Sequence, residues 1–478
     1  MTKRAVFLFY VALTLWLALH HEPWRDEADS WLMARDATVS QIIAIGPDSG
    51  HPPLWYFLLK PLSLSGLPYA AQPALNLIII WVAAWLLVFR SPFPSLLSGA
   101  ILLTDFFSFE YSVIARNYGL GIMGLFMCLA ASDQRVKHPN WLRIMGVFIM
   151  SLATLFTLIP AVSLLLIEAL RSLSDRAKRN RVIFPPNTWL MLAGVLAGAL
   201  SLWPSGKGQF SGRLFDHFFL QAPIDAMSTL LLPRQDYSGI YATLAAAAIV
   251  ATGILTMKLR WQAALFLTLS VLSLLLVFAS VFYQVDAPRY AGMLFVYTVS
   301  AAWLATSTKK AVSSESHKIR RQLWAMIVFF FLVQLPDTIS IWVRETISPF
   351  TDAPATANKL IAIGGTRKLV SCLPPTLCES ILLRMPGQTR FLYPGIGFGT
   401  HGFWDRQHRK AAGMSPDQGL KWTRAFLEKE EITTAGWIFM SPRPLSNPAA
   451  DGFHEITPTT SEAWGVKDET FYIYSTQD

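Results

Sequence analysis

Charged residues are scarce in this sequence. Asp, Glu, Lys and Arg make up 15% of its 478 residues, whereas a soluble domain has about 25%. Charged side chains form most of a water-facing surface, so this shortage argues against a wholly soluble protein. Cysteine is also rare, with three residues, and no histidine accompanies them at zinc-binding spacing, which argues against a cysteine-based metal site.

Hydrophobic residues, in contrast, make up 53% of the chain and gather in runs about as long as a bilayer core is thick, roughly 20 residues. The run after Lys3 and Arg4 has no small-residue cleavage site behind it, which favours a retained span over a cleaved signal peptide. The sequence therefore predicts an α-helical polytopic membrane protein with about eleven spans. They lie near 5–21, 70–89, 95–110, 117–132, 142–157, 158–171, 188–204, 237–257, 261–283, 288–306 and 323–342, with a tight turn expected at Pro160.

The net charge of +9 does not indicate nucleic-acid binding, because most basic residues lie in short loops between apolar runs. If the N-terminus is cytoplasmic, the inside loops hold far more Lys and Arg than the outside loops, which is the bias that fixes orientation. We therefore expect a multi-pass protein of a bacterial inner membrane. The loop 22–69 and the C-terminal region would then be extracytoplasmic.

Two regions outside the spans have a structure of their own. In the loop 22–69, the patterns of Asp29–Ile45 and Pro53–Leu64 predict helices that lie along the membrane surface. Residues 345–478 form a second predicted domain, a small extracytoplasmic α/β domain, and 1–344 the transmembrane domain. Short strands are expected around 370–372, 390–393, 436–439 and 471–474, and a helix over 417–430. Cys372 and Cys378 could form a disulfide there, whereas Cys128 is expected to fill apolar space.

The first candidate motif follows the first span directly. It places Asp26 and Glu27 at the membrane surface, between Arg25 and Asp29. A carboxylate beside a cation can act as a general base that accepts a proton from an attacking hydroxyl. A second carboxylate next to this base can orient a sugar or hold a divalent metal. The alternative is the first turn of a solvated helix, where Asp and Glu are common.

Three further motifs lie on the same predicted side of the membrane. Two prolines would fix His51 in the outer loop, where an imidazole could bond a phosphate. Arg116 lies at the start of the fourth span, and Arg289, within the motif Asp286–Tyr290, lies at the start of the tenth. Guanidinium groups can donate two hydrogen bonds to phosphate oxygens, so both arginines could bind a phosphate. Taken singly, His51 could be an inert loop histidine, Arg116 a partner of Glu110, and Arg289 an interfacial anchor. Together they suit a reaction that needs a base and a phosphate leaving group.

The motifs resemble those of the large membrane glycosyltransferases of the GT-C class. They are most similar to the family 39 protein mannosyltransferases and the lipid A aminoarabinose transferases. The matching stretches are Asp26-Glu27, His51-Pro52-Pro53 with aromatic residues behind it, Arg116-Asn117-Tyr118 and, more loosely, Arg289-Tyr290. Asn117 stands where these families have a proline, and the proline expected after Tyr290 is missing. The likeness is strong over 1–130, continues as general topology to 342, and does not extend to 345–478.

The resemblance implies an inverting transfer of a sugar from a polyprenyl-phosphate-linked donor to an extracytoplasmic glycan, lipid or protein acceptor. It implies that Asp26 is the general base and that Glu27 positions the acceptor or a metal. The donor phosphate would contact His51, Arg116, Tyr118 and Arg289. A bound Mg²⁺ or Mn²⁺ is left open, since carboxylates and histidine of this loop could supply ligands.

Three other functions remain open at this point. A membrane transporter would place ionisable residues near the middle of the membrane, whereas here they gather at the outer ends of spans, with Asp105 as the main exception. A polysaccharide polymerase or ligase would also use lipid-linked glycans. A non-catalytic assembly factor would work mainly through its C-terminal domain.

Overall fold

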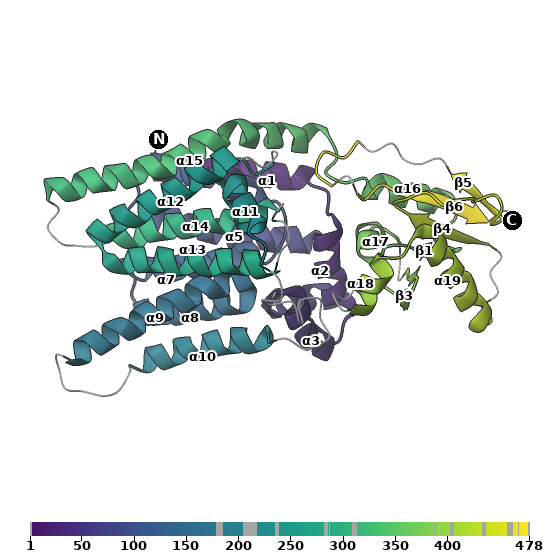
Figure 1. Ribbon diagram of the computed structural model, residues 1–478, viewed down its shortest axis with the longest axis horizontal. Helices are drawn as coiled ribbons and strands as arrows, with labels where there is room; N and C mark the ends of the chain where they lie inside the picture. The colour runs from purple at the N-terminus through teal and green to yellow at the C-terminus, as the bar shows by residue number, and fades with distance from the viewer. Residues whose placement is uncertain are drawn as a thin grey trace.

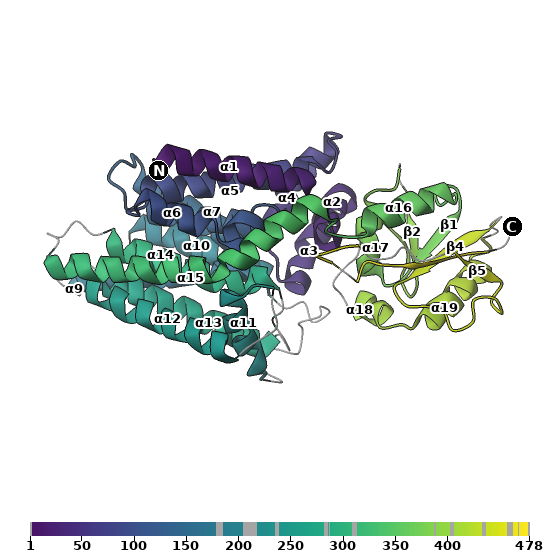
Figure 2. The ribbon, with the colours of Figure 1, turned by 90° about the horizontal axis from the view of Figure 1, so that it is seen from above.

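The protein is an elongated molecule with a helical bundle at one end and a smaller sheet domain at the other (Figure 1). The computed structural model describes residues 2–177, 185–203, 218–234, 239–281, 285, 287–307, 313–386, 389–401, 406–432, 436–456, 462–466 and 468–476. Seen from above, α2 (Arg25–Asp36) and α3 (Val39–Ser49) lie between the bundle and the sheet domain (Figure 2).

The bundle matches the predicted spans closely. It is built from α1 (Lys3–His20), α5 (Ala71–Arg90), α6 (Ser95–Leu102), the π-helical turn η1 (Phe106–Glu110), α7 (Tyr118–Ala130), α8 (Pro139–Ala153), α9 (Leu155–Ala177), α10 (Pro186–Ser201), α11 (Gln221–Leu231), α12 (Gly239–Leu259), α13 (Trp261–Val281), α14 (Pro288–Thr306) and α15 (Ser314–Ile347). Each predicted span overlaps one of these helices, except that the third overlaps α6 and η1 and the fifth, 142–157, runs from α8 into the start of α9. The sequence did not predict α11.

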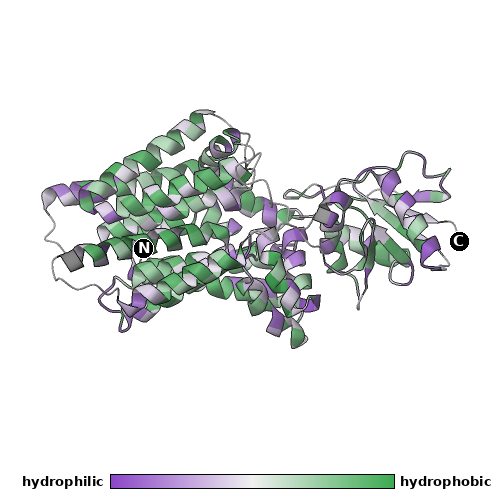
Figure 3. Ribbon diagram, turned by 60° about the horizontal axis from the view of Figure 1, so that its bottom comes forward, coloured by the Kyte–Doolittle hydropathy of each residue, from purple (hydrophilic) through white to green (hydrophobic). Residues whose placement is uncertain are grey.

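The bundle is a multi-pass membrane domain. In the described part of the chain, 6 helices are long and apolar enough to cross a bilayer: α1, α5, α9, α12, α13 and α15. Apolar residues run along the bundle helices, while polar residues gather at their ends and at the junction with the sheet domain (Figure 3). The exact number of spans stays a prediction.

The turn expected at Pro160 is wrong. The chain breaks instead at Thr154, whose backbone is extended between α8 and α9, and Pro160 lies inside α9. Proline lacks an N–H, so it leaves the carbonyl four residues earlier without its helical donor. That carbonyl belongs to Phe156 and accepts a hydrogen bond from the Tyr297 hydroxyl instead. The neighbouring helix α14 therefore lets α9 continue through its proline.

The loop 22–69 folds into α2 (Arg25–Asp36), α3 (Val39–Ser49) and α4 (Leu54–Leu64). The single helix expected over Asp29–Ile45 is wrong, because the chain leaves the helix at Ala37 and starts again. Thr38 explains the restart: its hydroxyl accepts from the Gln41 amide while the Gln41 side chain accepts from the Thr38 amide, which caps α3.

The C-terminal region is an α/β domain, as predicted. Its strands are β1 (Leu369–Cys372), β2 (Phe391–Tyr393), β3 (Gly397–Gly399), β4 (Trp437–Ser441), β5 (Phe453–Ile456) and β6 (Tyr472–Thr476). Its helices are α16 (Ala353–Ala362), α17 (Pro375–Leu382), α18 (Arg406–Ala412) and α19 (Pro416–Lys429). The strands form one sheet in the order β3-β2-β1-β4-β6-β5, with β1 parallel to both β2 and β4.

Apolar side chains cover both faces of this sheet. Helices α16 and α17 pack on one face and α19 on the other. Cys372 and Cys378 form a disulfide, and Cys128 is buried and free in the bundle, as expected. Leu32 of α2 belongs to the core beneath α16 and α17, so the sheet domain is seated on the helices of the 22–69 loop.

Candidate active site

Asp26 lies in the first turn of α2, where its carboxylate faces two arginines from distant parts of the chain. Its Oδ2 is 3.1 Å from Arg289 Nη2 and 3.7 Å from Arg116 Nη1. Arg116 also donates to the Asp26 backbone carbonyl. The Asp26 side chain is only 12% exposed. Two of the predicted phosphate-binding residues, Arg116 and Arg289, thus contact the predicted base. Asp286, from the same sequence motif as Arg289, lies outside the described residues.

His51 joins the cluster through Arg116. Its Nε2 is 3.2 Å from Arg116 Nη2 and must accept this hydrogen bond, since guanidinium nitrogens only donate. Nδ1 of the neutral ring then carries the hydrogen, and this buried atom has no hydrogen-bond partner among the described residues. Burial, and then the charge of Arg116, lower the pKa of His51 to about 3, so the ring is neutral at physiological pH.

The cluster leaves an excess of positive charge. Burial alone would raise the pKa of Asp26, but Arg116, Arg289 and Arg25 together hold it below its usual value, so the carboxylate is ionised. Arg25 has a partner of its own, Asp468, at 2.6 Å. One carboxylate therefore faces two guanidinium groups that are 9% and 14% exposed. A largely buried positive charge of this kind favours an anionic ligand.

Aromatic rings frame the two arginines. The Arg289 guanidinium lies over the rings of Trp24 and Tyr290, at 5.1 and 4.9 Å from their centroids. The rings of Tyr118 and His51 are nearly perpendicular, with 5.9 Å between their centroids. The Tyr118 hydroxyl is buried and, among the described residues, has no hydrogen-bond partner. Together with His51 Nδ1 it is a second unused donor beside the arginines.

Polar side chains of α5 hold the segment that carries Arg116. Gln72 donates to the carbonyls of Glu27 and Ala115, both at 3.0 Å, and Asn76 donates to the Ser112 carbonyl at 2.9 Å. Both side chains are fully buried in an otherwise apolar helix. Sequence reasoning missed these two residues, although a pair of amides inside the apolar run 70–89 was a readable signal.

Glu27 lies behind Asp26, and protein groups occupy both of its oxygens. Oε1 accepts from the Ala115 amide at 2.7 Å, and Oε2 lies 2.9 Å from His21 Nε2. The other ring nitrogen of His21 lies 2.7 Å from Glu345 at the end of α15. Sequence reasoning also missed His21 and Glu345. Glu27 thus fixes the segment before Arg116 and does not face the two arginines with Asp26.

The sheet domain holds the start of α2. The Arg25 amide donates to Glu469 Oε1 at 2.9 Å. Glu469 is fully buried and accepts on its other oxygen from Ser380 at 3.0 Å and from Thr351. The residue directly before Asp26 is therefore fixed by the C-terminal domain on both its backbone and its side chain.

The residues present do not form a metal site. Among the described residues, no group of three His, Cys, Asp or Glu side chains could hold a metal ion. Asp26 is already paired with two cations, and Glu27 is saturated by protein donors. These residues therefore do not fit Mg²⁺ or Mn²⁺.

The likeness of this chain to known proteins is one of structure. No family model and no curated protein sequence matches the chain. Two crystal structures of ArnT from Cupriavidus metallidurans match over 98% of this chain and 97% of theirs, with 13% sequence identity. The structure bound to undecaprenyl phosphate has a TM-score of 0.54 and the apo structure one of 0.51. The chain has the ArnT fold.

The ArnT fold confirms the fold class expected from the resemblance to the lipid A aminoarabinose transferases. The match spans the sheet domain as well, which the sequence did not relate to any family. Assignment to family 39 in particular stays a prediction, because an identity of 13% speaks only for the fold.

Proposed function

We propose that the protein transfers a sugar from a polyprenyl-phosphate-linked donor to an acceptor on the non-cytoplasmic side of the membrane. The observation that carries this proposal is the buried group of one carboxylate and two guanidiniums, Asp26 with Arg116 and Arg289, in a chain with the ArnT fold. It is further supported by the undecaprenyl phosphate bound in one of the matching ArnT structures.

In the proposed reaction, the acceptor hydroxyl oxygen bonds to the anomeric carbon while the bond from that carbon to the phosphate oxygen breaks. Asp26 takes the hydroxyl proton, and the lipid phosphate leaves with the electron pair. A single displacement inverts the anomeric centre. Arg116 and Arg289 stabilise the charge that develops on the phosphate, and losing one such contact costs about 3–4 kcal/mol.

His51 and Tyr118 complete the proposed phosphate site. Each offers a buried hydrogen-bond donor that no described residue uses, His51 Nδ1 and the Tyr118 hydroxyl. A buried donor without a partner costs about 1–3 kcal/mol, and a bound phosphate or sugar oxygen would remove that cost. These two groups would thus strengthen binding of the lipid-linked sugar without adding charge to the site.

Donor binding would also prepare the base. In the free protein the arginines lower the pKa of Asp26, which makes it a weak proton acceptor. A phosphate between Arg116 and Arg289 would share their charge, and the pKa of Asp26 would then rise. Asp26 would become basic only when the donor is in place. Glu27 would act indirectly, by holding the Arg116 segment through the Ala115 amide.

The decisive experiment compares Asp26→Asn with a matched variant on the same helix. Asp36→Asn changes a carboxylate of α2 that pairs with its neighbour Arg35. Membranes with either variant would be incubated with a labelled polyprenyl-phosphate sugar, and the labelled acceptor would be measured. Asp26→Asn should abolish transfer at normal expression and membrane insertion, and Asp36→Asn should not. Near-normal transfer by Asp26→Asn would remove Asp26 as the base.

A further inference from the structure

A polar cavity lies at the end of the bundle away from Asp26. Its volume is about 790 Å³. It is lined by residues of the α7–α8 connection, of the junction between α12 and α13, and by Ser307 after α14. These segments are at the opposite ends of their helices from Tyr118 and Arg289, so the cavity is separate from the candidate active site.

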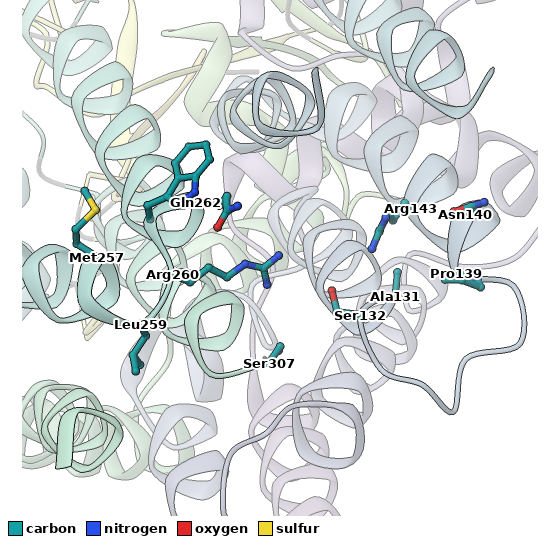
Figure 4. A pocket seen from close by; sticks show the side chains of 11 residues that line it. Ala131, Ser132, Pro139, Asn140, Arg143, Met257, Leu259, Arg260, Gln262 and Ser307 are labelled. Carbon is teal, nitrogen blue, oxygen red and sulfur yellow. The ribbon is translucent and has the colours of Figure 1, made fainter. Parts of the chain in front are cut away.

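Arginines dominate this cavity. The side chains of Arg143 and Arg260 point into it from opposite sides (Figure 4). A smaller space of about 50 Å³ adjoins it and is lined by the same two arginines and by Arg171 and Glu168. The Glu168 carboxylate lies 3.8 Å from Arg171. Glu168 therefore pairs with Arg171, and no ion pair joins it to Arg143 or Arg260.

The positive charge of the cavity is not neutralised within the described residues. None of their carboxylates forms an ion pair with Arg143 or Arg260, and Arg260 donates to the Leu304 carbonyl at 3.1 Å. Burial, and then the charges of Arg171 and Arg143, lower the pKa of Arg260 to about 10. Like charges held together at partial burial are costly without an anion between them.

The remaining lining indicates which anion fits. Ser132, Asn140, Gln262 and Ser307 supply uncharged hydrogen-bonding groups, as phosphate and glycerol oxygens require. Met257 and Leu259 supply an apolar wall.

Two exposed tryptophans place the cavity relative to the bilayer. Trp261, which lines it, and Trp141, next to Asn140, are 46% and 63% exposed. Exposed tryptophans at the ends of spans mark the head-group level of a membrane. The cavity thus lies where lipid head groups lie, which favours a lipid over a free anion.

We propose that this cavity, built around Arg143 and Arg260, binds the phosphate head group of an anionic membrane lipid. The proposal does not depend on sugar transfer, since no residue of the Asp26 cluster takes part. Basic pockets between membrane helices bind such head groups in the same way.

The test is lipid binding to the purified full-length protein in a neutral detergent, followed by native mass spectrometry. The probes are phosphatidylglycerol and cardiolipin, with phosphatidylcholine as the zwitterionic reference. The wild type should retain the anionic lipids at least about tenfold better than phosphatidylcholine, since hydrogen bonds from guanidinium groups to phosphate oxygens are strong. Equal retention would overturn the proposal, and this comparison needs no variant.

Variants then locate the site. Arg143→Gln with Arg260→Gln should lose most of the preference for anionic lipids, whereas the matched control Arg321→Gln, an exposed arginine at the start of α15, should keep it. Preference retained by the double variant would place the lipid elsewhere and overturn the assignment. Inorganic phosphate should not compete at millimolar concentration; effective competition would assign the cavity to a free anion. Asp26→Asn should bind lipid normally, which separates this outcome from failure of the proposed enzyme.

Discussion

His21 Nδ1 lies 2.7 Å from a carboxylate oxygen of Glu345, a residue 324 positions later in the chain. Because Nε2 of the same ring faces Glu27 at 2.9 Å, one imidazole joins the end of α1, the first turn of α2 and the end of α15. Burial alone would lower the pKa of His21, but the two carboxylates raise it to about 10. The ring is therefore a buried cation at physiological pH.

Replacing this cation should destabilise the protein in a pH-dependent way. His21→Gln leaves two buried carboxylates without a counter-charge, and breaking a buried pair costs roughly 3–5 kcal/mol. The pKa of His21 is raised above its ordinary value of 6.5, so its contribution is complete below that pH and is lost as the pH rises through about 10. Thermal unfolding in detergent should show a large deficit at pH 6–7 that shrinks towards pH 10.

His20→Gln is the control for this experiment, because His20 is exposed and its contacts lie within its own helix: Nδ1 with the Trp16 carbonyl and the ring with the Trp16 ring. It should unfold like the wild type. A deficit of His21→Gln that is the same at every pH would contradict the charged state of the ring.

The acid side of the pH–rate profile should depend on Arg289. Arg289→Gln removes one of the charges that lower the pKa of Asp26, so the pH below which kcat/KM falls should move upwards. The rate itself should drop by about 10²–10³, the usual effect of losing a charge-stabilising contact at a leaving group. Arg35→Gln changes an arginine of α2 outside the cluster and should leave both properties unchanged. An unmoved acid limb in Arg289→Gln would show that Asp26 is not the titrating base.

Glu469 should make the contact between the sheet domain and the start of α2 sensitive to pH. Burial raises the pKa of Glu469 to about 7, above its ordinary value of 4.5. Its stabilising contribution is then complete below pH 4.5 and is lost as the pH rises through about 7. Glu469→Gln keeps an oxygen acceptor for the Arg25 amide but cannot ionise, so it should be at least as stable as the wild type at pH 8. Glu462→Gln, an exposed change nearby, should retain the wild-type pH dependence.

The proposed orientation predicts which residues a membrane-impermeant maleimide reaches in intact cells. Ser65→Cys, exposed after α4 at the end that carries Asp26, should be labelled. Lys137→Cys, exposed between α7 and α8 at the other end, should be labelled only after the cells are opened. The native cysteines give little background, since one is buried and two form a disulfide. The reverse pattern would place Asp26 in the cytoplasm and end the proposal for sugar transfer.

The sequence was a good guide to the helices because the length and apolarity of a span are properties of a single segment. It was a poor guide where the structure of one segment depends on its contact with another. Pro160 lies inside α9, and Tyr297 of another helix donates to the Phe156 carbonyl that the proline leaves without its helical donor. The short helix α11, with Asp225 and Gln221 among its apolar residues, carries no span-like run and was not predicted.

The candidate site divides in the same way. Residue type and order in the chain were enough to select Asp26, Arg116 and Arg289, which the structure brings together. They were not enough to separate the neighbours Asp26 and Glu27, since a helix turns successive side chains by about 100°. Only packing reveals that the second of the two points to His21 and the Ala115 amide.

The attachment of Arg25 to the C-terminal domain affects how truncations would be interpreted. Asp468 and Glu469 hold the residue that precedes Asp26, so a protein ending after α15 would lose the anchor of its reactive helix as well as its sheet. Inactivity of such a shortened protein would not identify the sheet as the place where the acceptor binds. Exchanging exposed side chains on α19, far along the chain from Arg25, would ask that question without loosening the helix.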